Sequence, residues 1–384
     1  MNSYDEIPYK SSSFPQTHPD RLATIAHLFG LTPKPVTHCR VLELGCASGG
    51  NLIPMAYHLP KSEFIGIDLS ARQTQEAQTT ITDLQLSNIK IEQASIMDID
   101  GSWGSFDYII CHGVYSWVAN EVQDKILSVA SENLDLNGIV YVSYNVYPGW
   151  HMRDMVRRMM HYHSNQFESS EQRIDQARAL INFLASSTST DSYYGALLQN
   201  ELNLLQRCND SYLFHEHLEE HNSPIYFYEF NERAKENNLQ YLGESDFFTM
   251  INNRLPEEVS QTLEKISPDI IRREQYMDFL RNRFFRQTLL CHNHHALKRD
   301  ISSEVLKQML IASPLKPEPE LVDFSPNKNQ IFRSPNGFTI NTDFPLTKAA
   351  LTILSKNWPS AMHINTLLKE VHSRIKGDYT ESIQ

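Results

Sequence analysis

The chain has 384 residues, 41% of them hydrophobic, and carries a formal net charge of −12 at pH 7. Its length fits two or three globular domains, and its acidic balance disfavours a nucleic-acid partner, because such binding depends on neutralising phosphates. No apolar run is long enough to span a bilayer and the N-terminus lacks a secretory pattern, so we expect a cytoplasmic protein without a membrane partner.

The N-terminal segment is predicted to be an arm followed by a helix. Residues 1–16 are polar and contain prolines, which favours an extended arm. Residues 17–31 are predicted to form a helix, with Thr17 as its cap and Asp20 completing a T-x-x-D capping box. We therefore assign residues 1–35 to an N-terminal arm and lid helix.

From residue 39 onward, short apolar strands alternate with helices. Strands are predicted at residues 39–45, 63–70, 89–95, 106–113 and 139–145, and helices at residues 49–59, 71–85 and 121–134. A turn is predicted at residues 136–138, before the last of these strands. This alternation predicts an α/β fold with a Rossmann-like, doubly wound parallel sheet, and we assign it to residues 36–165.

The pattern changes in the second half of the chain. Residues 166–220 are predicted to be a helical insertion. Residues 221–312 form an α/β or mainly helical region, in which residues 230–245 hold a helix and a late strand and residues 257–310 are helical. Residues 313–384 contain a linker rich in proline and charge and a small C-terminal domain, with a candidate strand at residues 338–341.

The segment VLELGCASGG, residues 41–50, places glycines between a strand and a helix. Small residues there let the backbone approach a ligand, and free N–H groups at a helix start favour a carboxylate or phosphate. Ala47 breaks the dinucleotide pattern GxGxxG. The carboxylate of Glu43 suits a cationic ammonium or sulfonium ligand and would repel a pyrophosphate. Asp68, ending the next strand, is placed to bind ribose hydroxyls.

Together these features resemble the class I S-adenosylmethionine-dependent methyltransferases, whose glycine motif is matched except at Ala47. The resemblance implies S-adenosyl-L-methionine as cofactor and S-adenosyl-L-homocysteine as product. It implies that Glu43 reaches the cofactor's amino group through water and that Asp68 binds its ribose. The other implied contacts are Gly45, Cys46 and Gly49 at the methionine half, Leu69 on the adenine face, Ser95 and Ile96 at the base edge, and Cys111 and His112 over the methionine chain.

A closer resemblance covers nearly the whole chain to about residue 300. The segments HGVYSWV, SYNVYPGW and YFYEFNERAKENNLQYLGESDF look like methyltransferases that carry a methyltransferase regulatory domain. The resemblance assigns that regulatory domain to residues 221–312. That group includes rickettsial protein-lysine methyltransferases acting on outer-membrane proteins. Its members often continue beyond this length, so the C-terminal region is expected to be incomplete.

Methyl transfer is an in-line displacement at a sulfonium, so catalysis needs positioning and desolvation more than a strong acid or base. A lysine acceptor must first lose a proton, and aromatic faces stabilise its cation. The candidate catalytic residues are Asn145, Tyr147, Tyr115 and His18, and the candidate substrate-binding residues are Trp117 and Trp150. Tyr9 and Thr17 are expected to join His18 in a lid.

We therefore expect a methyltransferase with a protein or peptide acceptor, lysine favoured. Two alternatives stay open: a small-molecule methyltransferase with the insertion as its lid, and a cofactor-binding regulator without turnover. A homodimer also stays open. The HLEEH segment at residues 217–221 matches a zinc-peptidase pattern, and CHNHH at residues 291–295 is a second cluster. Both are interpreted as polar helix surfaces, and no metal site is predicted.

Overall fold

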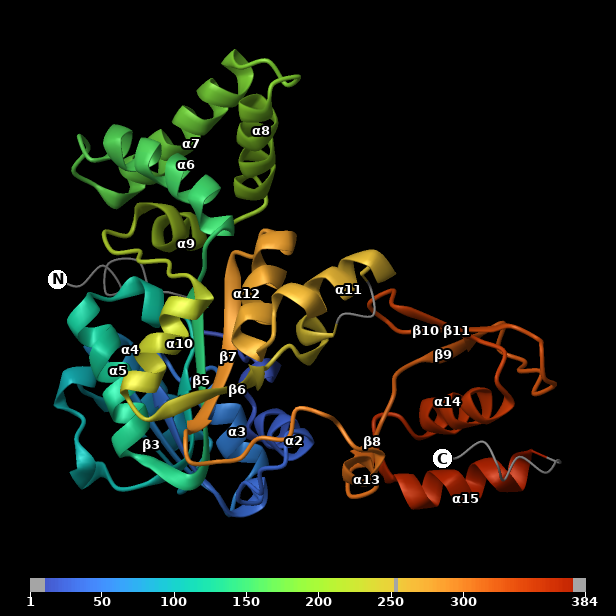
Figure 1. Ribbon diagram of the computed structural model, residues 1–384. Coiled ribbons are helices and arrows are strands. Elements are labelled where there is room, and N and C mark those ends of the chain that lie inside the picture. Colours follow the sequence, from blue (N-terminus) through green and yellow to red (C-terminus); the bar gives the residue numbers. More distant parts are fainter. Residues whose placement is uncertain (1–10, 252–254, 376–384) are drawn as a thin grey trace. The chain divides into compact units, whose positions relative to one another are not determined.

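The computed structural model describes residues 11–251 and 255–375. The chain divides into two compact units, residues 1–297 and 298–384. Each unit has its own hydrophobic core, and the candidate site lies in the first (Figure 1).

A seven-stranded sheet with the order β3-β2-β1-β4-β5-β7-β6 forms the centre of the first unit. Strands β1 to β5 are parallel, whereas β7 runs antiparallel to both β5 and β6. The predicted Rossmann-like fold is confirmed, although the sheet is mixed and not wholly parallel. The strands are β1 Arg40–Leu44, β2 Glu63–Asp68, β3 Ile89–Gln93, β4 Phe106–Cys111, β5 Leu134–Asn145, β6 Leu239–Glu244 and β7 Phe285–His292.

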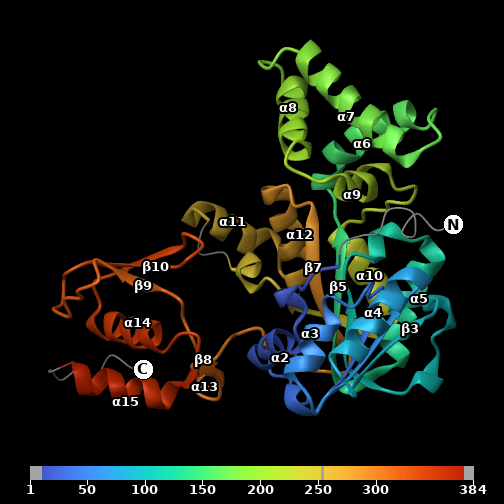
Figure 2. The same cartoon turned by 180° about the vertical axis from the view of Figure 1, so that it is seen from behind.

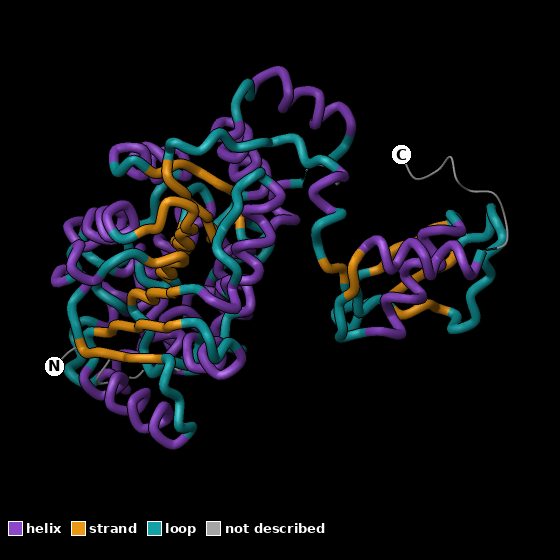
Figure 3. The backbone as a smooth tube through the Cα atoms, turned by 90° about the horizontal axis from the view of Figure 1, so that it is seen from below, coloured by secondary structure: helices purple, strands orange, loops and turns teal. Residues whose placement is uncertain are grey.

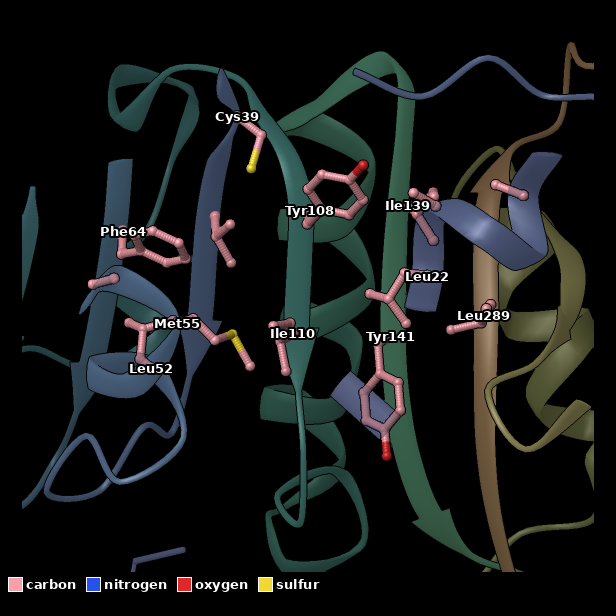
Figure 4. Packing of buried hydrophobic residues seen from close by; sticks show 14 of the residues in the cluster. Leu22, Cys39, Leu52, Met55, Phe64, Tyr108, Ile110, Ile139, Tyr141 and Leu289 are labelled. Atoms are coloured by element: carbon pink, nitrogen blue, oxygen red, sulfur yellow. The ribbon is translucent and has the colours of Figure 1, made fainter. Parts of the chain in front are cut away.

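Helices cover both faces of this sheet, so it is doubly wound (Figure 3). Side chains alternate along β4: Tyr108 and Ile110 join the core on one face, and Ile109 and Cys111 join the core on the other. Figure 4 shows the first of these two cores. Helices α2 Pro19–Leu28, α3 Leu52–His58 and α4 Ala71–Asp83 contribute to it, and α5 Asn120–Glu132 and α10 Phe227–Glu236 contribute to the second.

The helical insertion follows β5 and has a small core of its own (Figures 1 and 2). Apolar side chains of its helices, such as Met160, Ile181 and Leu198, meet in that core. The insertion consists of α6 Gly149–Ser164, α7 Ser170–Ser187, α8 Tyr193–Leu205 and α9 Asp210–Leu213, followed by a π-helix at Phe214–Leu218.

Residues 257–310 were expected to be helical, and after Arg281 this is wrong except for a short helix at Ser303–Leu306. Helices α11 Glu257–Ile266 and α12 Ile270–Arg281 are present, but Asn282 adopts a left-handed conformation that ends α12 and turns the chain into β7. Strand β7 escaped prediction because its buried positions include Arg286 and Thr288, which remove the apolar pattern of a central strand.

Two local predictions also need correction. The N-cap of α2 is His18 and not Thr17, because His18 Nδ1 accepts the Asp20 N–H while the Thr17 hydroxyl bonds elsewhere. The turn expected at residues 136–138 lies inside β5, where the pairing with β4 shifts register. Short 3-10 helices occur at Pro15–Thr17, Val36–His38, Ile96–Asp98, Gly101–Trp103, Tyr115–Trp117 and Phe247–Met250.

The second unit begins at residue 298, ahead of the linker predicted from residue 313, because β8 pairs with β12 near the other end of the unit. Its buried Lys348 donates three hydrogen bonds to backbone carbonyls and orders the loop at residues 323–328. The elements are α13 Ser303–Leu306, β8 Leu310–Ile311, β9 Lys316–Glu318, β10 Gln330–Arg333, β11 Thr339–Thr342, α14 Pro345–Asn357, β12 Met362–His363 and α15 Ile364–Arg374. Across the described part of the whole chain, no helix is long and apolar enough to cross a membrane.

Candidate active site

The carboxyl ends of the parallel strands meet at one edge of the sheet, where open α/β sheets bind their ligands. Most of the predicted site residues lie at this edge. They belong to the loops at residues 45–51 after β1, 68–70 after β2, 94–98 after β3, 112–117 after β4 and 146–148 after β5.

The glycine loop after β1 has a tightly constrained backbone. Gly45 and Gly49 both have φ values of 74°, in the left-handed region that favours glycine. Ala47, the one departure from the motif, has a φ of 50° and so occupies a position that also favours glycine. A Cβ atom at Gly45 would lie 2.5 Å from the side chain of Val114. The loop therefore packs closely against the segment that follows β4.

Much of the loop's hydrogen-bonding capacity is used within the chain, contrary to the expected free N–H groups. The N–H groups of Gly45 and Cys46 both donate to the Ile67 carbonyl. The Gly50 N–H donates to Ser11 Oγ at 2.8 Å, so the N-terminal arm occupies this position. The Cys46 thiol is buried in the core. Cys46 can therefore meet a ligand only through its backbone.

Glu43 supplies the clearest indication of a cationic ligand. It is 3% exposed, its Oε1 accepts a 2.7 Å hydrogen bond from Asn51, and its Oε2 is buried without a partner. Burial raises the pKa of this carboxyl to about 7, with the nearby Asp68 adding to the rise and the Asn51 hydrogen bond opposing it. A buried carboxylate oxygen without a donor is costly. An ammonium group beside Oε2 would remove that cost.

Asn51 connects Glu43 to the N-terminal arm, and the sequence analysis missed it. Its amide nitrogen donates to Glu43 and, at 2.9 Å, to Thr17 Oγ1, and its amide oxygen accepts the Phe14 N–H at 2.9 Å. No motif indicates this role, because it depends on contacts with residues of a distant arm. Thr17 thus belongs to the network that attaches the arm, while Tyr9 lies outside the described residues.

The end of β2 matches the requirements of a nucleoside. The Asp68 carboxylate accepts the N–H groups of Ala47 at 2.8 Å and Ser70 at 2.9 Å. These bonds fix its orientation, and a carboxylate at the end of this strand is the kind of acceptor that ribose hydroxyls require. The next residue, Leu69, is 60% exposed at the same edge, which is suited to covering an aromatic base.

The loop after β3 is ordered by its own capping box. Ser95 Oγ accepts the Met97 N–H, and the Asp98 side chain accepts the Ser95 N–H. Ile96 is partly buried against the core on the α5 face of the sheet. The Ser95 hydroxyl retains a proton and a further lone pair for a base edge.

The two residues predicted to close over the methionine chain differ in their surroundings. Cys111 is fully buried in the core on the α5 face, so its thiol does not face this edge. His112 Nδ1 lies 3.0 Å from Tyr141 Oη and 3.0 Å from Ser143 Oγ. Its ring lies 4.1 Å from that of Phe14, in the arm. Burial lowers the pKa of His112 to about 4, so the imidazole is neutral near pH 7.

At the end of β5, Tyr147 lies beside aromatic side chains from two other segments. The Tyr147 ring stacks 4.0 Å from His151 and lies 5.3 Å from Tyr226, and His151 Nε2 is 3.2 Å from Tyr226 Oη. Asn145 is buried and its amide donates to Asn222. Partial burial raises the pKa of Tyr147 above its ordinary value, so its phenol remains neutral. Neither His151 nor Tyr226 was predicted.

The structure separates the remaining candidates from this group. Tyr115 is fully buried among Tyr144 and Phe230, which indicates a packing role and argues against the predicted catalytic one. His18 caps α2 and lines a hollow with His58 of α3, and among the described residues its hydrogen bonds and ring contacts include none with the group around Tyr147. Its predicted catalytic role is therefore not supported.

The two tryptophans predicted to bind substrate contact each other, with ring centroids 6.0 Å apart. Trp150 is almost fully buried, and the Arg153 guanidinium lies over its ring. This burial indicates a packing role for Trp150 and argues against the predicted contact with substrate. Trp117 is only partly buried and remains a candidate for substrate contact.

Both histidine clusters were placed on helices, and both placements are wrong. The π-helix ends at Leu218, so His217 and His221 do not share a helical face, and His217 pairs with Glu201 at 2.7 Å. Cys291 and His292 lie on β7. Within residues 11–251 and 255–375, no group of three or more His, Cys, Asp or Glu side chains could hold a metal ion.

Comparison with known proteins gives two family matches. A model described as "Methyltransferase domain" matches residues 35–203, and one described as "Predicted methyltransferase regulatory domain" matches residues 209–292. The Rickettsia prowazekii protein RP789 is 41% identical over 389 residues, covering 100% of this chain and 70% of its own length. A second protein of that organism, RP028, is 43% identical over 62% of this chain and 96% of its own length.

Among solved structures, PKMT2 from Rickettsia typhi in complex with AdoHcy is similar to this chain with a TM-score of 0.87 and 38% identity. The match covers 98% of this chain and 73% of PKMT2. AdoHcy is S-adenosyl-L-homocysteine, the product expected from the glycine loop, Glu43 and Asp68.

The first prediction concerns Asn51. Replacing it by alanine removes the Glu43 hydrogen bond and the attachment of the arm, so we expect the affinity for S-adenosyl-L-homocysteine to fall about tenfold or more. Asn88→Ala is the matched control, because Asn88 also bonds buried carbonyls but lies away from the site. Both variants should lower the melting temperature. Titration calorimetry should show the fall in affinity for S-adenosyl-L-homocysteine only in Asn51→Ala. Equal affinities of Asn51→Ala and Asn88→Ala for S-adenosyl-L-homocysteine would contradict the role of Asn51.

The second prediction follows from the raised pKa of Glu43. In the free protein its stabilising contribution is complete below the ordinary value of 4.5 and is lost as the pH rises through about 7. An ammonium ligand needs the carboxylate, so the affinity should rise about tenfold per pH unit up to about pH 7 and then level off. Titration calorimetry with S-adenosyl-L-homocysteine at a series of pH values below and above 7 measures this affinity. Glu43→Gln should remove the dependence, and a flat wild-type profile would refute the assignment.

Proposed function

The chain belongs to the class I S-adenosylmethionine-dependent methyltransferases that carry a methyltransferase regulatory domain, and from this premise we propose that its acceptor is a protein side chain, with lysine favoured. The observation that carries the proposal is the group of Tyr147, His151 and Tyr226 rings at the end of β5. Aromatic faces attract the cation of a lysine side chain.

The relatives support a protein acceptor. The similarity to PKMT2 extends over 98% of this chain, well beyond the methyltransferase domain. The resemblance to protein-lysine methyltransferases therefore includes SYNVYPGW at residues 143–150, which contains residues 146–149, here called the acceptor loop.

The site residues have separate tasks in the proposed reaction. S-adenosyl-L-methionine, when bound, supplies a methyl group on a sulfonium that is open to in-line attack. Glu43 and Asp68 would hold its ammonium and ribose, and Phe14, held by Asn51, would exclude water from the arm side. Tyr147 would orient the amine. His151, with Tyr226 at 3.2 Å, would accept the proton that the lysine ammonium must lose.

The proposal is tested by incubating the chain with radiolabelled S-adenosyl-L-methionine and a lysate of the source cell. We expect label in protein, and amino-acid analysis should recover it as methylated lysine. Label recovered only in small molecules would contradict the protein acceptor while leaving the methyltransferase activity intact. Label in protein on a residue other than lysine would contradict only the lysine assignment.

A further prediction concerns Tyr147. Tyr147→Phe removes one hydroxyl and keeps the ring stack, so we expect turnover to fall about tenfold or more with cofactor affinity within about twofold. Tyr162→Phe is the control, since Tyr162 is 90% exposed on the neighbouring α6. Initial rates of label transfer and calorimetry measure the two quantities. A parallel loss of turnover and cofactor affinity would make Tyr147 structural.

A further inference from the structure

The acceptor loop, residues 146–149, donates backbone hydrogen bonds to residues 209–292, the part of the chain matched by the regulatory-domain model, which we call the regulatory segment. The Val146 N–H donates to the Phe284 carbonyl at 3.0 Å, and the Gly149 N–H donates to the Arg283 carbonyl at 2.9 Å. The Tyr147 N–H donates to Ile225. Pro148 has no N–H, so every amide donor of this loop goes to residues 209–292.

The contact between Gly149 and this segment leaves no free space. A Cβ atom at Gly149 would lie 2.5 Å from the Arg283 carbonyl oxygen and 2.7 Å from that of Asn282. Both are backbone atoms, which cannot move aside as the end of a flexible side chain can. The position of residues 282–284 therefore sets the position of the acceptor loop and of Tyr147 within it.

Residues 282–284 are in turn held by a buried cluster of charges. Arg286 is almost fully buried and pairs with Glu244 on β6 and with Asp278 and Glu274 on α12. Its guanidinium also lies 3.9 Å from the centre of the Phe227 ring on α10. Arg283 pairs with Asp278 at 3.2 Å. We call Arg283, Arg286, Glu244, Glu274 and Asp278 the charge cluster.

The charge cluster has a second route to the acceptor loop. Glu244 accepts a 3.0 Å hydrogen bond from the Thr288 hydroxyl, which lies 2.9 Å from Tyr144 Oη. Tyr144 immediately precedes Asn145 on β5. Both the backbone and the side chains at the end of β5 are thus connected to the same set of buried charges.

Stability alone does not account for such a cluster. Burying several charges costs desolvation energy, and well-packed apolar residues of similar volume often stabilise a protein as well or better. What a buried ionic cluster does supply is one defined geometry, since each guanidinium satisfies its partners in a single arrangement.

We propose that the charge cluster fixes residues 282–284 of the regulatory segment and thereby the position of the acceptor loop, with Arg283 as the positioning residue. This inference rests on the proposed placement of the acceptor at Tyr147. It gives the regulatory segment a specific action on the reaction: it controls how the acceptor is presented and leaves the cofactor's binding edge unchanged.

The test is Arg283→Gln, with Arg272→Gln as control because Arg272 lies on α12, the helix that carries Glu274 and Asp278, but is 67% exposed and outside the cluster. Hydrogen exchange of peptides covering residues 144–151 should be about tenfold faster in Arg283→Gln, and that of residues 45–52 should be unchanged. The KM for the protein acceptor in the lysate should rise about tenfold. The affinity for S-adenosyl-L-homocysteine should stay within about twofold of the wild-type value.

Gly149→Ala is an independent test that leaves the charge cluster intact. It should produce the same faster exchange and the same rise in acceptor KM, whereas Gly101→Ala should not, since a Cβ atom there meets nothing within 4 Å. If Arg283→Gln does not fold, Gly149→Ala decides the question. Unchanged exchange, or faster exchange with an unchanged acceptor KM, would overturn the proposal. Exchange needs no acceptor, so unchanged exchange is distinct from a failure to label protein, which would contradict the proposed function instead.

Discussion

The arrangement of the candidate site depends on the hydrogen bond between Asn51 and the buried carboxylate of Glu43. A carboxylate that is 3% exposed must be compensated, and Asn51 satisfies only one of its oxygens. The same amide attaches the N-terminal arm through Thr17 and Phe14. The side chain that orients Glu43 is therefore also the one that holds the arm. The carboxylate placed for a cationic ligand and the N-terminal arm are connected through Asn51.

Much of the fold could be predicted because its signals are local. The apolar strands β1 to β5, the glycine loop and Asp68 are read from short stretches of residues. Strand β7 could not be predicted, since buried Arg286 and Thr288 replace the apolar pattern and depend on partners from β6 and α12. Asn51 and Tyr226 escaped for a related reason. Their roles arise from contacts between segments far apart in the chain, which no single stretch of sequence reveals.

The predicted catalytic group shows the same limit. Asn145 and Tyr147 were identified by their place after β5, and the structure adds His151 and Tyr226 beside Tyr147. Tyr115 was chosen on the same reasoning after β4, but its ring packs into the core against Phe230. A residue's position at a strand end predicts its proximity to the site. Which side chains reach the site depends on packing, and here that packing includes residues of the regulatory segment, such as Tyr226 against Tyr147.

The central claim is that the carboxyl edge binds S-adenosyl-L-methionine through Glu43 and Asp68 with the arm in place. A crystal structure of the chain with S-adenosyl-L-homocysteine tests it most directly. It should show the ribose hydroxyls bonded to Asp68, the amino group bonded to Glu43 Oε2 directly or through one water, and Asn51 still bonded to Phe14. A ligand held at this edge without either carboxylate, or with the arm displaced and Asn51 turned away from Glu43, would contradict the account.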